Sequence, residues 1–88
     1  MAERSVTVVN KNGVHARPAA EIVKAAAKFK SDILICRDEV EVNGKSIMGV
    51  MMLAAECGST LLIRATGPDE IEALDALARL IAARFGEH

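Results

Sequence analysis

The order of hydrophobic and polar positions changes period several times along the chain, and each change predicts a new element. Runs of β-branched and aliphatic residues bounded by polar turns are typical of strands, and they occur at 6–9, 33–36, 40–42 and 60–65. Apolar residues spaced by three and four predict helices that begin at 16 or 17, at 47 and at 70, and reach 29, 53 and 85. Residues 33–42 form a predicted hairpin with a tight turn at 37–39.

The longer predicted helices each carry a candidate core face. The first presents Ala19, Ile22, Val23, Ala26 and Phe29, and the last presents Ile71, Leu74, Leu77, Ala78, Ile81 and Phe85. Ser46 is a predicted N-cap for the middle helix, because its hydroxyl can accept a hydrogen bond from an amide of the first turn. Gly58 is the predicted left-handed stop after that helix, and Gly86 follows the end of the last one.

The resulting order is βαββαβα, which predicts an α+β domain of two layers. Each helix has one apolar face, and only one sheet is available to cover it. Residues 1–88 are expected to form a single domain, since no internal repeat, linker or low-complexity segment interrupts them. Many unrelated functions share this split βαβ order, so function must be argued from a site.

Composition narrows the possible partners. The 88 residues carry a formal net charge of −1 and include no Trp or Tyr, which argues against nucleic acid and against a membrane surface. Met1 to Ser5 runs straight into the first strand without the features of a signal peptide, and a cytoplasmic location is expected.

The two cysteines, Cys36 and Cys57, form no CxxC pair and have no companion histidine cluster. They are therefore expected to be reduced thiols in or near the core. No metal site and no cofactor are expected.

His15 stands directly before the predicted first helix and is the candidate nucleophile. If that helix begins at Ala16 or Arg17, its first N–H groups lack internal partners and form an anion site. The positive helix end favours the neutral imidazole, whose lone pair can attack. Arg17 can offer a planar fork of donors to a phosphoryl group, and Pro18 stiffens the turn. The predicted chemistry is a transient phosphohistidine, because phosphoryl transfer needs mainly positioning and charge stabilisation.

The plain alternative is that His15 only caps the helix or packs on the surface. Isolated histidines commonly do one or the other. No Ser/His/Asp arrangement is visible, and no carboxylate lies close in sequence to His15, so hydrolytic catalysis has no support.

Two segments resemble known signatures of one family. Residues 13–19, GVHARPA, resemble the active-site signature of the HPr family, the histidine-containing phosphocarriers of the bacterial phosphotransferase system. Residues 43–51, NGKSIMGVM, resemble the family's regulatory serine segment at the expected distance downstream. The resemblance covers essentially the whole chain in length and element order.

The resemblance implies a specific cycle. Enzyme I, charged by phosphoenolpyruvate, passes a phosphoryl group to Nδ1 of His15, and the carrier delivers it to a histidine of an enzyme IIA domain. Arg17 and the backbone amides of Ala16 and Arg17 hold the phosphate. The carrier is modified and restored by its partners and is not an enzyme with its own small-molecule substrate. The implied fold is an antiparallel sheet of order 1-4-2-3 with three helices on one face, and a monomer is expected.

Ser46 has two interpretations. The structural one is an ordinary N-cap worth about 1 kcal/mol. In the regulatory one, implied by the resemblance, an HPr kinase/phosphorylase adds a phosphate that suits a helix N-terminus but opposes docking by acidic partners.

The middle helix is apolar on nearly every side, which predicts an exposed apolar patch beside His15. The resemblance implies that Ile47, Met48 and Met51 dock enzyme I and enzyme IIA, and methionine suits a surface with several partners. The alternative is that these residues are simply buried. Lys24, Lys28 and Lys45 are expected to rim the patch and steer acidic partners, or else to form an ordinary solvated face.

Two further alternatives stay open. The run 47–53, with Met52 where sugar-transport members often carry a small polar residue, also resembles the nitrogen-linked regulatory branch of the family. A different class of function is a non-catalytic protein-binding module that displays the methionines. Val14 replaces a frequent leucine or isoleucine, a conservative change.

Overall fold

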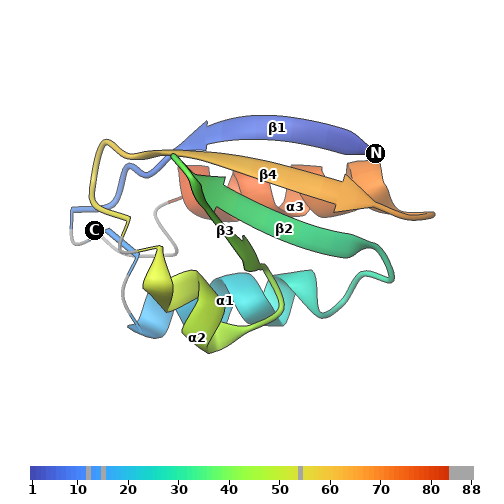
Figure 1. Ribbon diagram of the computed structural model, residues 1–88, viewed down its shortest axis with the longest axis horizontal. Helices are drawn as coiled ribbons and strands as arrows, with labels where there is room; N and C mark the ends of the chain where they lie inside the picture. Colours follow the sequence, from blue (N-terminus) through green and yellow to red (C-terminus); the bar gives the residue numbers. More distant parts are fainter. Residues whose placement is uncertain (12, 15, 54, 84–88) are drawn as a thin grey trace.

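The computed structural model describes residues 1–83 except 12, 15 and 54, and it contains four strands and three helices (Figure 1). In chain order these are β1 (Ala2–Thr7), α1 (Ala16–Ala26), β2 (Asp32–Arg37), β3 (Val40–Asn43), α2 (Ile47–Met52), β4 (Thr60–Thr66) and α3 (Glu70–Ala82). The predicted βαββαβα order is confirmed.

The four strands form one antiparallel sheet in the order β1-β4-β2-β3. β4 occupies an interior position, where it pairs with β1 from Ala2↔Ala65 to Thr7↔Thr60 and with β2 on its other edge. α1 and α3 lie behind the sheet in Figure 1, and α2 packs beside α1 and near β3. This is the two-layer α+β architecture, and the strand order implied by the resemblance is confirmed.

The core lies between the sheet and the helices. Alternate residues of the two interior strands point into it, because successive side chains of a strand face opposite sides. The buried strand residues are Ile33, Ile35, Leu61, Ile63 and Ala65. They meet the buried faces of the two long helices, of which Ile22, Leu77 and Ile81 are the largest members. Burial of such side chains contributes roughly 1.5–3 kcal/mol each.

The first strand differs from its prediction. β1 spans Ala2–Thr7, whereas the sequence pattern placed it at 6–9. β1 is an edge strand, and its side chains are mostly exposed. Because backbone hydrogen bonds to β4 hold it, no apolar alternation in the sequence marks its position. Val8, although fully buried, follows the strand and donates its amide to the carbonyl of Ser59 at 2.8 Å.

The ends of α1 and α2 also differ. α1 ends at Ala26, three residues before Phe29, because the amides of Lys28 and Phe29 bond carbonyls three residues back and so form a tighter turn. Phe29 still packs against the core. α2 ends at Met52, so Gly58 is not its stop: Gly58 has a φ of +92° but lies in the loop before β4.

The face of α3 is largely as predicted, with one exchange. Leu74, Leu77 and Ile81 are buried, but Ile71 is 54% exposed and Ala73 is fully buried. Residues 71 and 73 differ by about 200° around a helix, so the apolar pattern alone misplaced the edge of the face. Phe85 and Gly86 lie outside the described residues.

Asp69 joins the start of α3 to the turn between α1 and β2. Its side chain makes no cap bond to α3; instead its carboxylate accepts hydrogen bonds from the amides of Lys30 and Ser31, each at 2.9 Å, and from the Ser31 hydroxyl. These bonds, led by the one from the hydroxyl, lower the pKa of the Asp69 carboxyl.

Because the folded state lowers this pKa, Asp69 stabilises the fold above the ordinary value of 3.8 and loses that contribution as pH falls through the folded value. We expect Asp69→Asn to be less stable than the parent chain at pH 7, and the difference to shrink below about pH 4. Urea unfolding at several pH values measures this. Asp75→Asn on the same helix, which removes only an exposed ion pair with Arg4, is the control and should show a smaller difference. If the difference in free energy of unfolding between Asp69→Asn and the parent does not change with pH, the Asp69 carboxylate does not have this stabilising role.

Candidate functional site

The segment before the first helix is held by a second loop. Val8 accepts a hydrogen bond from the Gly58 amide at 2.7 Å, and the Val14 amide donates to the Ala55 carbonyl at 2.7 Å. Asn10, fully buried, donates its side-chain amide to the Gly13 carbonyl at 2.6 Å. The predicted nucleophile His15 lies outside the described residues. Val14, the residue before it, is buried and is held by its hydrogen bond to Ala55 in the second loop.

Gly13 makes the close approach of these loops possible. Its φ is +68°, in the region that favours glycine, and a Cβ there would overlap the carbonyl oxygen of Ala55 and lie 2.9 Å from Cα of Glu56. The first residue of the predicted signature therefore has a steric reason to be glycine.

The signature continues into the first turn of α1. The helix begins at Ala16, as the sequence predicted, and Ala16 and Arg17 are exposed while Pro18 is buried. The first N–H groups of a helix have no acceptor inside it, and no acidic side chain occupies the first turn of α1. This end of the helix has the electrostatic character of an anion site, with Arg17 at the surface beside it.

Ser46 caps α2, as predicted. Its backbone is extended, with φ of −114° and ψ of 118°, and its hydroxyl oxygen accepts a hydrogen bond from the Gly49 amide at 3.2 Å. The Ser46 carbonyl accepts the Val50 amide at 2.9 Å, which begins the helical pattern. The side chain is half-buried.

The apolar side chains of α2 are mostly exposed. We call Ile47, Met48, Met51 and Met52 the methionine patch; their exposed fractions are 46%, 78%, 43% and 72%. In this helix only Val50 is buried. Contiguous exposed apolar patches on small proteins commonly mark interaction surfaces, whereas single exposed apolar residues are ordinary. Met52 belongs to the patch although the sequence analysis did not assign it to docking.

The three lysines expected around the patch occupy different environments. The ammonium of Lys45 donates to the carbonyl of Phe29 at 2.8 Å and its side chain is half-buried. Lys45 is therefore held by the turn after α1 and differs from a freely exposed charge at the rim of the patch. Lys24 and Lys28 line a groove between α1 and α3. The groove also takes in Arg79, which the sequence analysis did not select.

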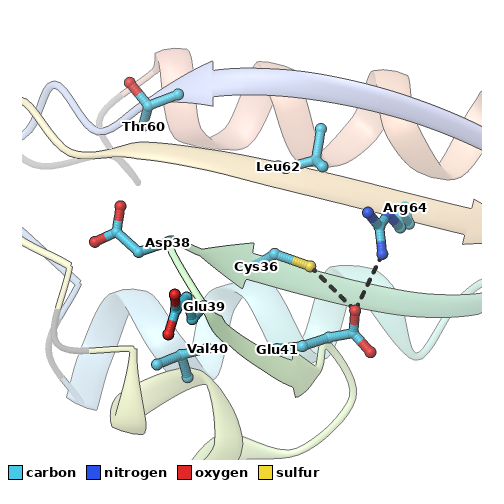
Figure 2. A pocket seen from close by; sticks show the side chains of 8 residues that line it. All are labelled: Cys36, Asp38, Glu39, Val40, Glu41, Thr60, Leu62 and Arg64. Carbon is cyan, nitrogen blue, oxygen red and sulfur yellow. Dashed lines mark hydrogen bonds and ion pairs between the residues drawn. The ribbon is translucent and has the colours of Figure 1, made fainter.

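A second hollow lies on the face of the sheet opposite α1 and α3 (Figure 2). Its volume is about 220 Å³, and at its centre the Cys36 thiol donates to a Glu41 oxygen at 3.5 Å, while Arg64 bonds the same oxygen at 3.1 Å. Arg64, on β4, also pairs with Glu3 of β1. The side chains of Glu3, Arg64 and Glu41 therefore link β1, β4 and β3 across the sheet. Cys36 is half-buried and Cys57 is exposed, both as free thiols, so the expectation that both lie in or near the core is wrong for Cys57.

Burial, and then the contact with the Glu41 carboxylate, raise the pKa of the Cys36 thiol. The thiolate is the reactive form, so iodoacetamide should label Cys36 more slowly than Cys57 at pH 8, with a gap that narrows as pH rises. Mass spectrometry of the digested protein measures both rates. Glu41→Gln should accelerate the labelling of Cys36 and leave the labelling rate of Cys57 unchanged. An equal rate for Cys36 in the parent and variant chains would show that Glu41 does not control this thiol.

Neither a membrane-spanning helix nor a metal-binding cluster occurs among the described residues. None of the helices there is long and apolar enough to cross a membrane. The same residues contain no group of three or more His, Cys, Asp or Glu side chains arranged to hold a metal ion.

The fold and the site together define a class of protein. A four-stranded sheet of order 1-4-2-3 with a Gly-x-x-Ala-Arg-Pro segment entering α1, and a serine-capped apolar helix beside α1, is the architecture of small phosphocarrier domains. A family model described as "PTS HPr component phosphorylation site" matches residues 2–83. The chain belongs to the HPr family, the phosphocarriers of the phosphotransferase system.

Individual relatives agree with this assignment. The "Phosphocarrier protein HPr" of Treponema pallidum is 54% identical over 87 residues, covering 99% of each chain. A crystal structure of HPr-C-His from Thermoanaerobacter tengcongensis superimposes with a TM-score of 0.95 at 46% identity, covering 100% of this chain and 99% of that one. A crystal structure of an HPr dimer from the same organism gives a TM-score of 0.79 at 47% identity, covering 99% and 100%. At least one relative has thus been observed as a dimer.

Proposed function

We propose that this phosphocarrier accepts its phosphoryl group on Nδ1 of His15 from enzyme I and donates it to a histidine of an enzyme IIA domain. In the first step the lone pair of neutral His15 attacks the phosphorus held by enzyme I. The bond between phosphorus and the donor group of enzyme I breaks as the new N–P bond forms, and the donor group keeps the bonding electron pair. The second step is the same exchange toward enzyme IIA, so the carrier ends each cycle unchanged.

The observation that carries this proposal is the junction between Val14 and Ala16. Val14 is fixed to the Ala55 carbonyl on one side of His15, and α1 begins at Ala16 on the other. We therefore expect His15, which lies between them in the sequence, to reach the end of α1 that favours anions. The amides of Ala16 and Arg17 and the Arg17 guanidinium would supply donors to the phosphoryl oxygens. Phosphoryl transfer needs little more than such positioning and charge stabilisation.

Incubation with enzyme I and ³²P-labelled phosphoenolpyruvate tests the proposal. The expected product is a labelled chain whose adduct is labile in acid and stable in base, as a phosphohistidine is. A ¹⁵N-labelled imidazole should report phosphorylation at Nδ1. The protein-binding module considered above would bind partners through the methionine patch without acquiring label, so an unlabelled chain would favour it.

We further propose that the methionine patch docks both partners and that Ser46 regulates this docking. Exposed methionines suit several different partner surfaces, because the unbranched side chain adapts its shape. Lys24 would steer acidic partners from the neighbouring helix, while Lys45 would act mainly by holding the patch to the turn after α1. A phosphate on Ser46 would suit the N-terminus of α2 but repel an acidic partner at the patch.

The Ser46 proposal predicts that two substitutions have different effects. Ser46→Ala removes the cap and should lower the free energy of unfolding by about 1 kcal/mol while leaving phosphoryl acceptance near the parent rate. Ser46→Asp keeps a capping oxygen and adds a charge, so stability should hold while acceptance from enzyme I slows. Urea unfolding and rapid-quench transfer measure the two effects. An unchanged transfer rate in Ser46→Asp would remove the regulatory role.

The working form is proposed to be a cytoplasmic monomer. Sedimentation at several concentrations tests this against the dimer seen for a relative. Whether the carrier serves sugar uptake or the nitrogen-linked branch is decided by its acceptor. Parallel transfer assays with a sugar-type and a nitrogen-type enzyme IIA distinguish the two.

A further inference from the structure

The groove between α1 and α3 has about 440 Å³ of space and lies outside the site described above. Its apolar lining is partly small and consists of Ala25 of α1 with Ala76 and Leu80 of α3. The remaining lining residues are charged: Glu21, Lys24, Lys28 and Arg79. The groove therefore combines a short apolar surface with long charged side chains.

The charge of the groove is unlike that of the chain. It holds three cations against one carboxylate, whereas the whole chain has a net charge of −1. Lys24 is 3.9 Å from Glu21, an exposed pair of little energetic value. Lys28 and Arg79 form no ion pair with any residue in the described part of the chain. Cations near the C-terminus of a helix interact favourably with its dipole, but the dipole does not explain why apolar residues line the same groove.

We propose that this groove binds an acidic amphipathic helix of a partner protein. Two packed helices present a furrow into which the apolar ridge of a third helix fits, and small residues such as Ala25 and Ala76 let its backbone approach closely. Carboxylates on both sides of that ridge would meet Lys28 of one wall and Arg79 of the other. From residue 21 in α1 to residue 28 in the turn after it, the groove is about 10 Å long, which corresponds to about two turns of the incoming helix.

The position of the groove separates it from the methionine patch. α1 packs against α2 and also against α3, so the two surfaces lie on different sides of the same helix. A partner in the groove would leave the methionine patch free. The carrier could then be recognised by this partner while it exchanges phosphoryl groups with others. Binding in the groove should not require His15.

The test uses the full chain labelled with ¹⁵N and a synthetic peptide of roughly 18 residues, since shorter isolated helices are marginal in water. The peptide carries leucines at i, i+3, i+4 and i+7 with glutamates on both flanks. The expected result is a set of saturable amide shifts centred on Ala25, Ala76 and Leu80. A peptide of the same composition in scrambled order should give no such set.

Matched variants separate the groove from general charge attraction. Lys28→Gln with Arg79→Gln removes two groove cations and should weaken peptide binding roughly tenfold, the effect of losing about 0.7 kcal/mol at each contact. Lys11→Gln with Lys30→Gln removes the same charge elsewhere and should leave the affinity unchanged. Thermal unfolding should show both pairs folded, and phosphoryl acceptance from enzyme I is measured separately.

Four outcomes would overturn the inference. They are the absence of saturable shifts, equal weakening in both variant pairs, shifts centred on the methionine patch, and the same groove shifts with inorganic phosphate alone. The last of these would identify a site for small anions instead of a helix. Because enzyme I is absent from the titration, failure here is distinguishable from failure of the phosphocarrier proposal.

Discussion

A chain carrying His15→Gln should accept no phosphoryl group from enzyme I. Glutamine can still hydrogen-bond at this position, but its amide nitrogen has no lone pair available for attack on phosphorus. We expect no detectable labelling, because without the attacking atom no phosphoryl group reaches the amides of α1. Labelled phosphoenolpyruvate with enzyme I, followed by gel separation at alkaline pH, measures it.

The chain provides its own control, since it contains only two histidines. His88→Gln removes the other one, at the far end of the sequence, and should retain the parent rate. Label that persists in His15→Gln and disappears in His88→Gln would move the acceptor to the C-terminus and refute the proposed site.

Gly13→Ala should be among the most destabilising single-methyl changes in the described chain. At a φ of +68° an alanine costs about 1–2 kcal/mol, and overlap with the Ala55 carbonyl adds to this because backbone cannot move as a side-chain end does. We expect a total loss of about 3 kcal/mol, or a fall in Tm of about 12–24 °C for a domain of this size. The two loops must also separate, which weakens the Val14 bond and should slow phosphoryl acceptance.

Gly58→Ala is the matched control for this change. Gly58 also has a positive φ, +92°, but a Cβ there meets nothing within 4 Å. Only the backbone cost of about 1 kcal/mol should appear, with no effect on transfer. Calorimetry and transfer assays on both variants test the comparison. Equal losses in the two chains would show that contact with the second loop does not explain the glycine at position 13.

Elements with a strong apolar period were predictable from the sequence. α3, β2, β4 and the Ser46 cap follow from spacing and capping chemistry, which depend on near neighbours in the chain. β1 was misplaced because an edge strand takes its stability from hydrogen bonds to β4 and needs no apolar alternation. Ile71 was misplaced because the edge of a helix face is decided by what packs there, and the period alone does not contain that information.

The candidate site was predictable only as a motif. GVHARPA identifies the segment, but the reason for Gly13 lies in Ala55 and Glu56, more than forty residues away. The sequence could not show that the Lys45 ammonium is hydrogen-bonded, because its acceptor, the carbonyl of Phe29, is 16 residues away in the chain. The α1–α3 groove was missed for the same reason: Lys28 and Arg79 come together only when the helices pack.

A single-turnover relay experiment tests the central claim most directly. The chain is first labelled with ³²P by enzyme I, purified from it, and then mixed with an enzyme IIA domain in a rapid-quench apparatus. Label is expected to leave the chain and to appear on enzyme IIA in equal amounts, with none released as inorganic phosphate during transfer. Label that stays on the chain, or that reaches enzyme IIA equally well through His15→Gln, would contradict it.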